Sequence, residues 1–149
     1  MKVKEFWEFL CEEMDYRFFA GVPCKGFKPL YDSMSPKFMH YIPAVNENVA
    51  LALTSGVSIA GTKSAVLVKF EGLCRLFGCL VSINIQYKVP VLILTYRDAS
   101  YGEIIKSLTS HGIPHRVLRN VKKDLRYLTK RMDTLGLPGV AIIEEGTLE

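Results

Sequence analysis

A carboxylate at the head of an uncharged helix pattern is the feature of this sequence best suited to chemistry. Glu47 lies in Ala44-Val45-Asn46-Glu47-Asn48, and residues 49–60, which follow, carry no charge. Burial disfavours the charged form of such a carboxyl, whereas the positive end of the helix dipole favours it. A group held in that balance can accept or donate a proton. A structural role is the other open interpretation, because an acidic residue also suits a helix N-terminus.

Three cations accompany loops that follow strand patterns. Lys25 and Lys28 flank the turn in Gly21-Val22-Pro23-Cys24, where each either binds an acidic group as a point charge or is a solvated loop lysine. Arg97 ends a later strand pattern and either binds an acid group or forms a surface ion pair with Asp98 or Glu103. These residues are candidates for recognising a negatively charged ligand.

The elements that must position these residues alternate along the chain. Periodicity predicts strands over residues 17–22, 40–45, 64–70, 89–96, 115–118 and 140–143. It predicts helices over residues 3–16, 27–34, 46–61, 73–87, 101–110 and 121–134. Because residues 64–70 and 89–96 are continuously apolar, they are typical of parallel strands covered on both faces. We therefore expect an α/β, three-layer, doubly wound fold with a mostly parallel sheet of about six strands, forming one domain over residues 1–149.

Such a sheet brings the candidate loops to a common edge, since ligands of open α/β sheets bind beyond the carboxyl ends of the strands. The helix over 46–61 is apolar on every side, so we expect it to be buried on every side. The basic run between Arg116 and Arg131 is interpreted as a solvated helix face rather than an RNA patch.

Composition narrows the classes of protein to which this chain can belong. The chain has 149 residues, a formal charge of +4 and four cysteines, which show neither a CxxC pair nor zinc-ligand spacing. We expect no bound metal on this chain, no nucleic-acid partner and no membrane segment. The first residues predict a helix rather than a signal peptide, so we expect a reducing, cytoplasmic compartment.

Four segments carry a resemblance to a known family. They are Gly21-Val22-Pro23, Lys28-Pro29-Leu30, Ala44-Val45-Asn46-Glu47 leading a small-residue helix, and Val89-Pro90-Val91-Leu92-Ile93-Leu94. In this order they resemble the pyrimidine-binding domain of thiamine-diphosphate-dependent decarboxylases. The likeness is greatest to the α subunit of split sulfopyruvate decarboxylases and to phosphonopyruvate decarboxylases, and the Asn-Glu pair is its most specific element.

This resemblance implies a cofactor and roles for individual residues. Glu47 is then the catalytic residue, which hydrogen-bonds N1′ of the aminopyrimidine ring of thiamine diphosphate. The other cofactor-binding residues implied are Pro23, Asn46, Gly72 and Leu73. The substrate is a small 2-oxo acid such as sulfopyruvate, which gives sulfoacetaldehyde and carbon dioxide, and Lys25, Lys28 and Arg97 are candidates for its acid group.

The family also implies a second subunit. Its members hold the diphosphate through a metal ion, Mg²⁺ being expected, bound by a Gly-Asp-Gly…Asn segment that does not occur in this sequence. We therefore expect a separate diphosphate-binding β subunit that supplies the metal, with the chain forming a homo- or hetero-oligomer.

Two departures from the family pattern leave alternatives open. In Lys69-Phe70-Glu71-Gly72-Leu73-Cys74-Arg75 only Gly72-Leu73 match, and the loop over residues 97–103 is short. The alternatives are a decarboxylase subunit for phosphonopyruvate or another 2-oxo acid, and a degenerate domain that assembles with a partner without catalysis.

Overall fold

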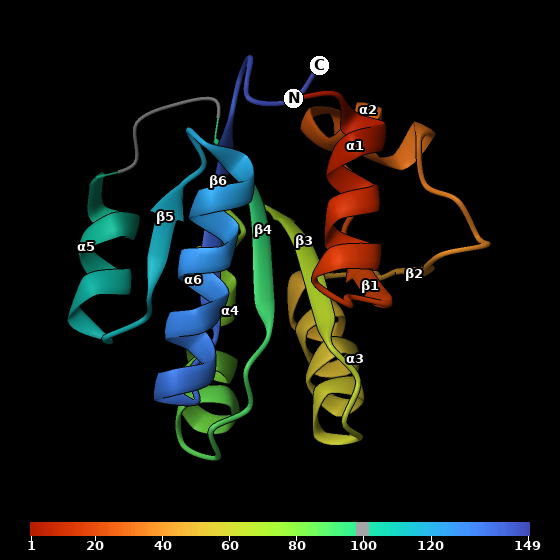
Figure 1. The fold of residues 1–149 in the computed structure, drawn as a ribbon. Helices are drawn as coiled ribbons and strands as arrows, with labels where there is room; N and C mark the ends of the chain where they lie inside the picture. The colour runs from red at the N-terminus through yellow and green to blue at the C-terminus, as the bar shows by residue number, and fades with distance from the viewer. Residues whose placement is uncertain (98–101) are drawn as a thin grey trace.

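Six parallel strands form the single sheet seen in the computed structural model, which describes residues 1–97 and 102–149 (Figure 1). The strands are β1 (Phe18–Gly21), β2 (His40–Pro43), β3 (Ser64–Lys69), β4 (Leu92–Arg97), β5 (His115–Val117) and β6 (Gly139–Glu144). Their order across the sheet is β2-β1-β3-β4-β6-β5, and every neighbouring pair is parallel. The expected α/β class and parallel sheet are confirmed.

Helices connect the strands and cover both faces of the sheet. They are α1 (Val3–Glu8), which continues as the π-helical segment η1 (Phe9–Glu13), the 3₁₀ turn η2 (Lys25–Phe27), α2 (Lys28–Asp32), α3 (Glu47–Ile59), α4 (Leu73–Cys79), which continues as the π-helical segment η3 (Leu80–Ile85), α5 (Gly102–Ser110) and α6 (Val121–Leu135). In Figure 1, α1 and α6 lie in front of the sheet, and α3 and α4 lie behind it. The predicted helices are confirmed apart from shifts at their ends, and Tyr101, the expected start of α5, lies outside the described residues.

Alternation along the central strands builds one hydrophobic core on each face. Leu67 and Leu94 point to the α1 and α6 side, where they join Phe6, Phe19 and Leu125. Their neighbours along the strands, such as Val66 and Ile93, point to the side of α3, α4 and α5. Because successive strand residues point to opposite faces, a continuously apolar strand stabilises both layers at once.

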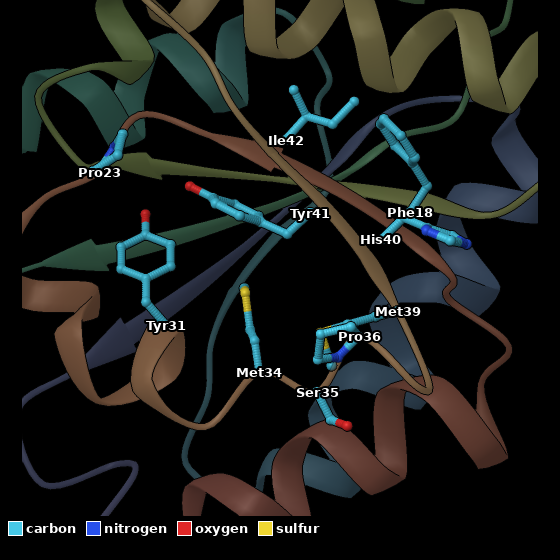
Figure 2. A pocket seen from close by; sticks show the side chains of 10 residues that line it. All are labelled: Phe18, Pro23, Tyr31, Met34, Ser35, Pro36, Met39, His40, Tyr41 and Ile42. Carbon is cyan, nitrogen blue, oxygen red and sulfur yellow. The ribbon is translucent and has the colours of Figure 1, made fainter.

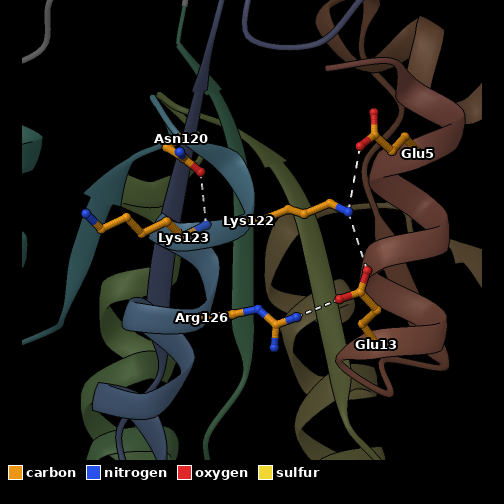
Figure 3. Close-up of polar contacts among 6 residues, drawn as sticks. All are labelled: Glu5, Glu13, Asn120, Lys122, Lys123 and Arg126. Atoms are coloured by element: carbon orange, nitrogen blue, oxygen red, sulfur yellow. Dashed lines mark hydrogen bonds and ion pairs between the residues drawn. The ribbon is translucent and has the colours of Figure 1, made fainter.

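Helix α6 is joined to α1 and η1 by ion pairs (Figure 3). Lys122 Nζ lies 3.4 Å from Glu13 Oε1 and 3.7 Å from Glu5 Oε1, and Arg126 Nη2 lies 2.5 Å from Glu13 Oε2. Asn120 caps the helix by accepting a hydrogen bond from the Lys123 backbone N–H at 3.2 Å. Part of the basic run is therefore neutralised within the chain.

A buried carboxylate anchors the start of the same helix. Asp124 accepts hydrogen bonds from Arg116 Nε at 2.5 Å and from the backbone N–H groups of Arg119 and Asn120 at 2.9 and 2.8 Å. Burial acts to raise the pKa of Asp124, but these donors outweigh it and hold the pKa below its ordinary value.

The prediction that α3 is buried on every side is wrong. One side packs on β1 and β3 and another on α4, but Val49 and Ile59 are 39% and 69% exposed, and Ala52 and Gly56 between them are exposed as well. The four helix residues lie at helical spacing, and with Val45, which precedes the helix and is 88% exposed, they form a surface that we call the α3 stripe. Among the described residues the chain has no further layer to cover this side of the helix.

Within the described residues, no helix combines the length and apolarity that a bilayer-spanning segment needs.

Candidate functional site

Glu47 occupies the first turn of α3, immediately after the turn that follows β2. Asn46 is the N-cap residue, and its side-chain oxygen accepts a hydrogen bond from the Val49 backbone N–H at 2.9 Å. This cap leaves the Glu47 carboxylate free of a capping role, and Glu47 is only 8% exposed. The side chain that caps the helix is therefore that of Asn46, whereas Glu47 is the acidic residue of the first turn.

Gly72 provides the floor on which the Glu47 side chain rests. A Cβ atom at position 72 would lie 3.0 Å from Glu47 Oε1, 3.1 Å from Glu47 Cγ and 3.1 Å from the Lys69 carbonyl oxygen. The turn is fixed at this distance because the Gly72 N–H donates to the same Lys69 carbonyl at 2.9 Å. Close approach to Glu47 thus requires glycine at position 72, which explains one of the two family-like residues of this loop.

Leu73, the other family-like residue, has a mainly structural position. It is fully buried in the core beneath α3 and α4 and begins α4 directly after Gly72. Its packing fixes where α4 starts, and so where Gly72 meets Glu47.

Arg75, which the sequence analysis counted only as a departure from the family pattern, is the ionic partner of Glu47. Its Nη1 lies 3.2 Å from Glu47 Oε2 and 3.5 Å from Glu47 Oε1. The guanidinium side chain is 71% exposed, whereas the Glu47 side chain is 11% exposed. Gly72 and Arg75 lie one helical turn apart, which puts them on the same side of α4, but no signal in the sequence places that side beside Glu47.

The first loop opens onto an apolar cavity of about 900 Å³ (Figure 2). Pro23 lies at one end of it, and the side chains of Tyr31, Met34 and Tyr41 line its wall. The Tyr31 and Tyr41 rings lie 5.3 Å apart between centroids. Sequence reasoning missed this cavity, because its walls come from β1, β2, α2 and the irregular segment between α2 and β2.

The two phenols of this cavity are held in their neutral form. The Tyr31 hydroxyl donates to the Val22 carbonyl at 3.3 Å, and the Tyr41 hydroxyl donates to the Gly21 carbonyl at 3.5 Å. Burial raises the pKa of both Tyr31 and Tyr41 above the ordinary tyrosine value. Neither hydroxyl is therefore suited to act as a base near neutral pH.

The three cations predicted for substrate binding lie in different settings. Lys25 begins η2 and is exposed. Lys28 forms an exposed ion pair with Asp32, at 2.5 Å. Arg97 forms an ion pair with Glu144 of the neighbouring strand β6, and its guanidinium lies 5.7 Å from the centre of the Phe70 ring.

The two ion-pair partners considered for Arg97 have different outcomes. Glu103 is paired with Lys106, at 2.7 Å, and the ion pair that Arg97 forms in the structure is with Glu144. Asp98, together with the rest of residues 98–101 in the short loop after β4, lies outside the described residues.

The site fits the aminopyrimidine end of the cofactor that the sequence resemblance implies. The nearly buried Glu47 carboxyl can hydrogen-bond a ring nitrogen, and glycine at position 72 lets that carboxyl lie close against the backbone. Across residues 1–97 and 102–149, no three His, Cys, Asp or Glu side chains come together as a metal ion requires.

Curated relatives that the chain matches are named as sulfopyruvate decarboxylases. The chain is 28% identical over 96 residues to sulfopyruvate decarboxylase subunit alpha of Methanococcus maripaludis, and the match covers 64% of this chain and 58% of the relative. It is 28% identical over 122 residues to the same subunit of Methanocaldococcus jannaschii, covering 81% of this chain and 64% of the relative. A match of 29% identity over 93 residues, to sulfopyruvate decarboxylase of Methanosarcina acetivorans, covers 62% of this chain and 24% of that protein.

The fold recurs in larger enzymes of known structure. A 2-oxoglutarate:ferredoxin oxidoreductase from Magnetococcus marinus matches 99% of this chain with a TM-score of 0.74 at 17% identity, over 29% of its own chain. Benzoylformate decarboxylase from Polynucleobacter necessarius matches 97% of this chain with a TM-score of 0.69 at 20% identity, over 30% of its own chain. No family model matches the sequence. The resemblance to sulfopyruvate decarboxylase α subunits is confirmed, and the match spans about three fifths of the length of such subunits.

Proposed function

We propose that this chain, a relative of sulfopyruvate decarboxylase α subunits, forms the aminopyrimidine half of a thiamine-diphosphate site in a 2-oxo acid decarboxylase. The observation that carries the proposal is the Glu47 carboxyl, nearly buried against the Gly72 backbone at the start of α3. The relatives support sulfopyruvate as the substrate, because that activity is in their names.

Glu47 has one task in this proposal. It holds a proton at N1′ of the aminopyrimidine ring through a hydrogen bond, and the low exposure of its side chain keeps water from competing for that proton. Gly72 sets the position of the carboxyl, and Asn46 holds the helix that carries it. When bound, thiamine diphosphate supplies the ring that accepts the electron pair left by departing carbon dioxide.

A second chain completes the site in this proposal. The matching relatives are named as α subunits, and the described residues hold no cluster of metal ligands of their own. The α3 stripe suits such a partner, since a contiguous exposed apolar surface is typical of protein interfaces. We propose that a diphosphate-binding β subunit, which brings the metal ion, expected to be Mg²⁺, covers the α3 stripe.

Lys25 is the cation best placed to meet the acid group of the substrate. Lys28 and Arg97 are already paired with Asp32 and Glu144, whereas Lys25 is exposed on the loop after β1. We propose a cytoplasmic enzyme, which the four free cysteines support because a reducing compartment preserves thiols.

The test is to purify the tagged chain from its native extract and measure bound thiamine diphosphate and sulfopyruvate decarboxylation in the eluate. We expect a second subunit, bound cofactor and activity. Glu47→Gln in the same complex should lower kcat about a hundredfold or more, since it removes the proton-holding group. Glu8→Gln is the matched control, because Glu8 is an exposed carboxylate on α1, and it should leave kcat unchanged. Full activity of Glu47→Gln would refute the proposed role, and an eluate that holds a partner but neither cofactor nor activity would favour a domain that only assembles.

A further inference from the structure

Arg75 forms an ion pair with the candidate catalytic carboxylate of Glu47 but plays no part in the proposed chemistry. We propose that Arg75 is a latch that occupies Glu47 in the uncomplexed chain, and that an aminopyrimidine binds only when this ion pair opens. The proposal rests on the function proposed for Glu47 and adds a regulatory contact to that site.

Arg75 and the ring compete for the same atoms. Nη1 of Arg75 lies within 3.5 Å of both oxygens of Glu47, so one N–H group faces both acceptors of the carboxylate. Gly72 also packs against the same carboxylate, since a Cβ at position 72 would lie 3.0 Å from Oε1. Because the Glu47 side chain is only 11% exposed, a ring nitrogen that hydrogen-bonds it has to share the acceptor atoms that the guanidinium already contacts.

The ion pair has the character of a reversible contact. Arg75 is 71% exposed and its long side chain can move into solvent without disturbing the core. Ion pairs with a solvent-exposed member contribute little stability, so we expect the latch to lower pyrimidine affinity only by about twofold to fivefold. A contact of this strength keeps Arg75 on the carboxylate while the site is empty. It opens when a ligand is bound by both this chain and the partner subunit.

The position of Arg75 links the latch to assembly. Its neighbours Cys74 and Gly78 are exposed on the same helix, α4, which packs beside α3. A subunit that covers the α3 stripe and this part of α4 would approach the guanidinium directly. Docking of the partner can thus displace Arg75. Glu47 then becomes available to the aminopyrimidine in the complex, where the partner supplies the rest of the site.

The test measures binding of a probe that has the ring without the diphosphate, 4-amino-5-hydroxymethyl-2-methylpyrimidine, to the full chain. Binding is followed by calorimetry and by the amide NMR signals of Glu47 and Gly72. Arg75→Met keeps most of the side-chain length and removes the charge, and it should bind the probe about twofold to fivefold more tightly than the wild type. Lys106→Met is the matched control, because Lys106 is paired with Glu103 on α5; its affinity should equal that of the wild type.

Salt distinguishes a latch from a merely structural arginine. Because salt screens the ion pair, high salt should raise the affinity of the wild type and leave Arg75→Met almost unchanged. Arg75→Met that binds no more tightly than the wild type, or shows no binding, overturns the latch, provided its unfolding midpoint shows that it is folded.

The Glu47→Gln chain separates this failure from failure of the proposed function. If Glu47→Gln binds the probe as well as the wild type does, the role of Glu47 is wrong. If Glu47→Gln loses binding while Arg75→Met gains none, the role of Glu47 stands and the latch alone is refuted.

Discussion

Replacing Gly72 with alanine tests the packing on which the whole site depends. The new Cβ would lie 3.0 Å from Glu47 Oε1 and 3.1 Å from both Glu47 Cγ and the Lys69 carbonyl oxygen. Each contact is several tenths of an ångström shorter than an ordinary carbon contact. The Lys69 carbonyl is held by its hydrogen bond from the Gly72 N–H, so the Glu47 side chain is the group that must move.

The expected cost follows from this overpacking. Extra atoms in a closely packed site destabilise by about 1–3 kcal/mol. For a domain of this size that corresponds to a fall in Tm of about 2–10 °C. In the assembled enzyme, the same displacement should weaken cofactor binding, because the carboxyl no longer lies where the ring requires it.

The assay compares two alanine variants of neighbouring glycines in thermal and urea unfolding of the chain alone. Gly78 lies within α4, and a Cβ there would meet nothing within 4 Å. Gly78→Ala should therefore raise stability by about 0.5–1 kcal/mol through the lower entropy of its unfolded chain. If Gly72→Ala unfolds at or above the wild-type midpoint, as Gly78→Ala is expected to do, the close packing of Glu47 on Gly72 is refuted.

Three further predictions concern other parts of the chain. Asp124→Asn should lower the free energy of unfolding by about 1–3 kcal/mol at neutral pH. Because the folded pKa of Asp124 lies below its ordinary value of 3.8, this difference from the wild type should shrink as pH falls through the folded pKa. A difference that stays constant in urea unfolding down to that pH would contradict the prediction. Ala52→Glu places a charge in the exposed α3 stripe, so it should abolish co-elution of a partner in size-exclusion chromatography while changing the stability of the chain by less than about 0.5 kcal/mol; undiminished co-elution would exclude the stripe from the interface. Burial raises the pKa of Cys11 to about 11, so a thiol reagent at mildly alkaline pH should modify the exposed Cys74 and spare Cys11 until the chain unfolds, as peptide mapping by mass spectrometry would show.

The elements of the fold were predictable because each has a strong local pattern. The apolar runs of β3 and β4 and the Asn46 cap of α3 are properties of neighbouring residues, so the sequence alone indicates them. The packing of Glu47 against Gly72 was predictable only in part. Resemblance indicated Gly72, but the reason for glycine, the contact with Glu47, appears only once α3 and α4 are packed together.

The ion pairs of the site could not be predicted, because each joins residues that are distant in the chain. Arg75 meets Glu47 across 28 positions, through the angle at which α4 passes α3. Arg97 meets Glu144 because β6 pairs with β4, and periodicity does not give strand order. The exposed side of α3 was missed for a related reason. An apolar helix pattern predicts that the helix is covered, but it does not tell whether the covering surface belongs to the same chain or to a partner.

The parallel pairing of all six strands has a consequence for how the chain folds. Neighbouring parallel strands cannot be joined by a tight hairpin, so each pairing in this sheet requires a crossover that brings distant segments together. Chains dominated by such contacts fold slowly and expose apolar surface to aggregation while they do so. We therefore expect recombinant chain to be recovered in better yield when the partner is synthesised in the same cell, with the α3 stripe shielded as soon as it forms.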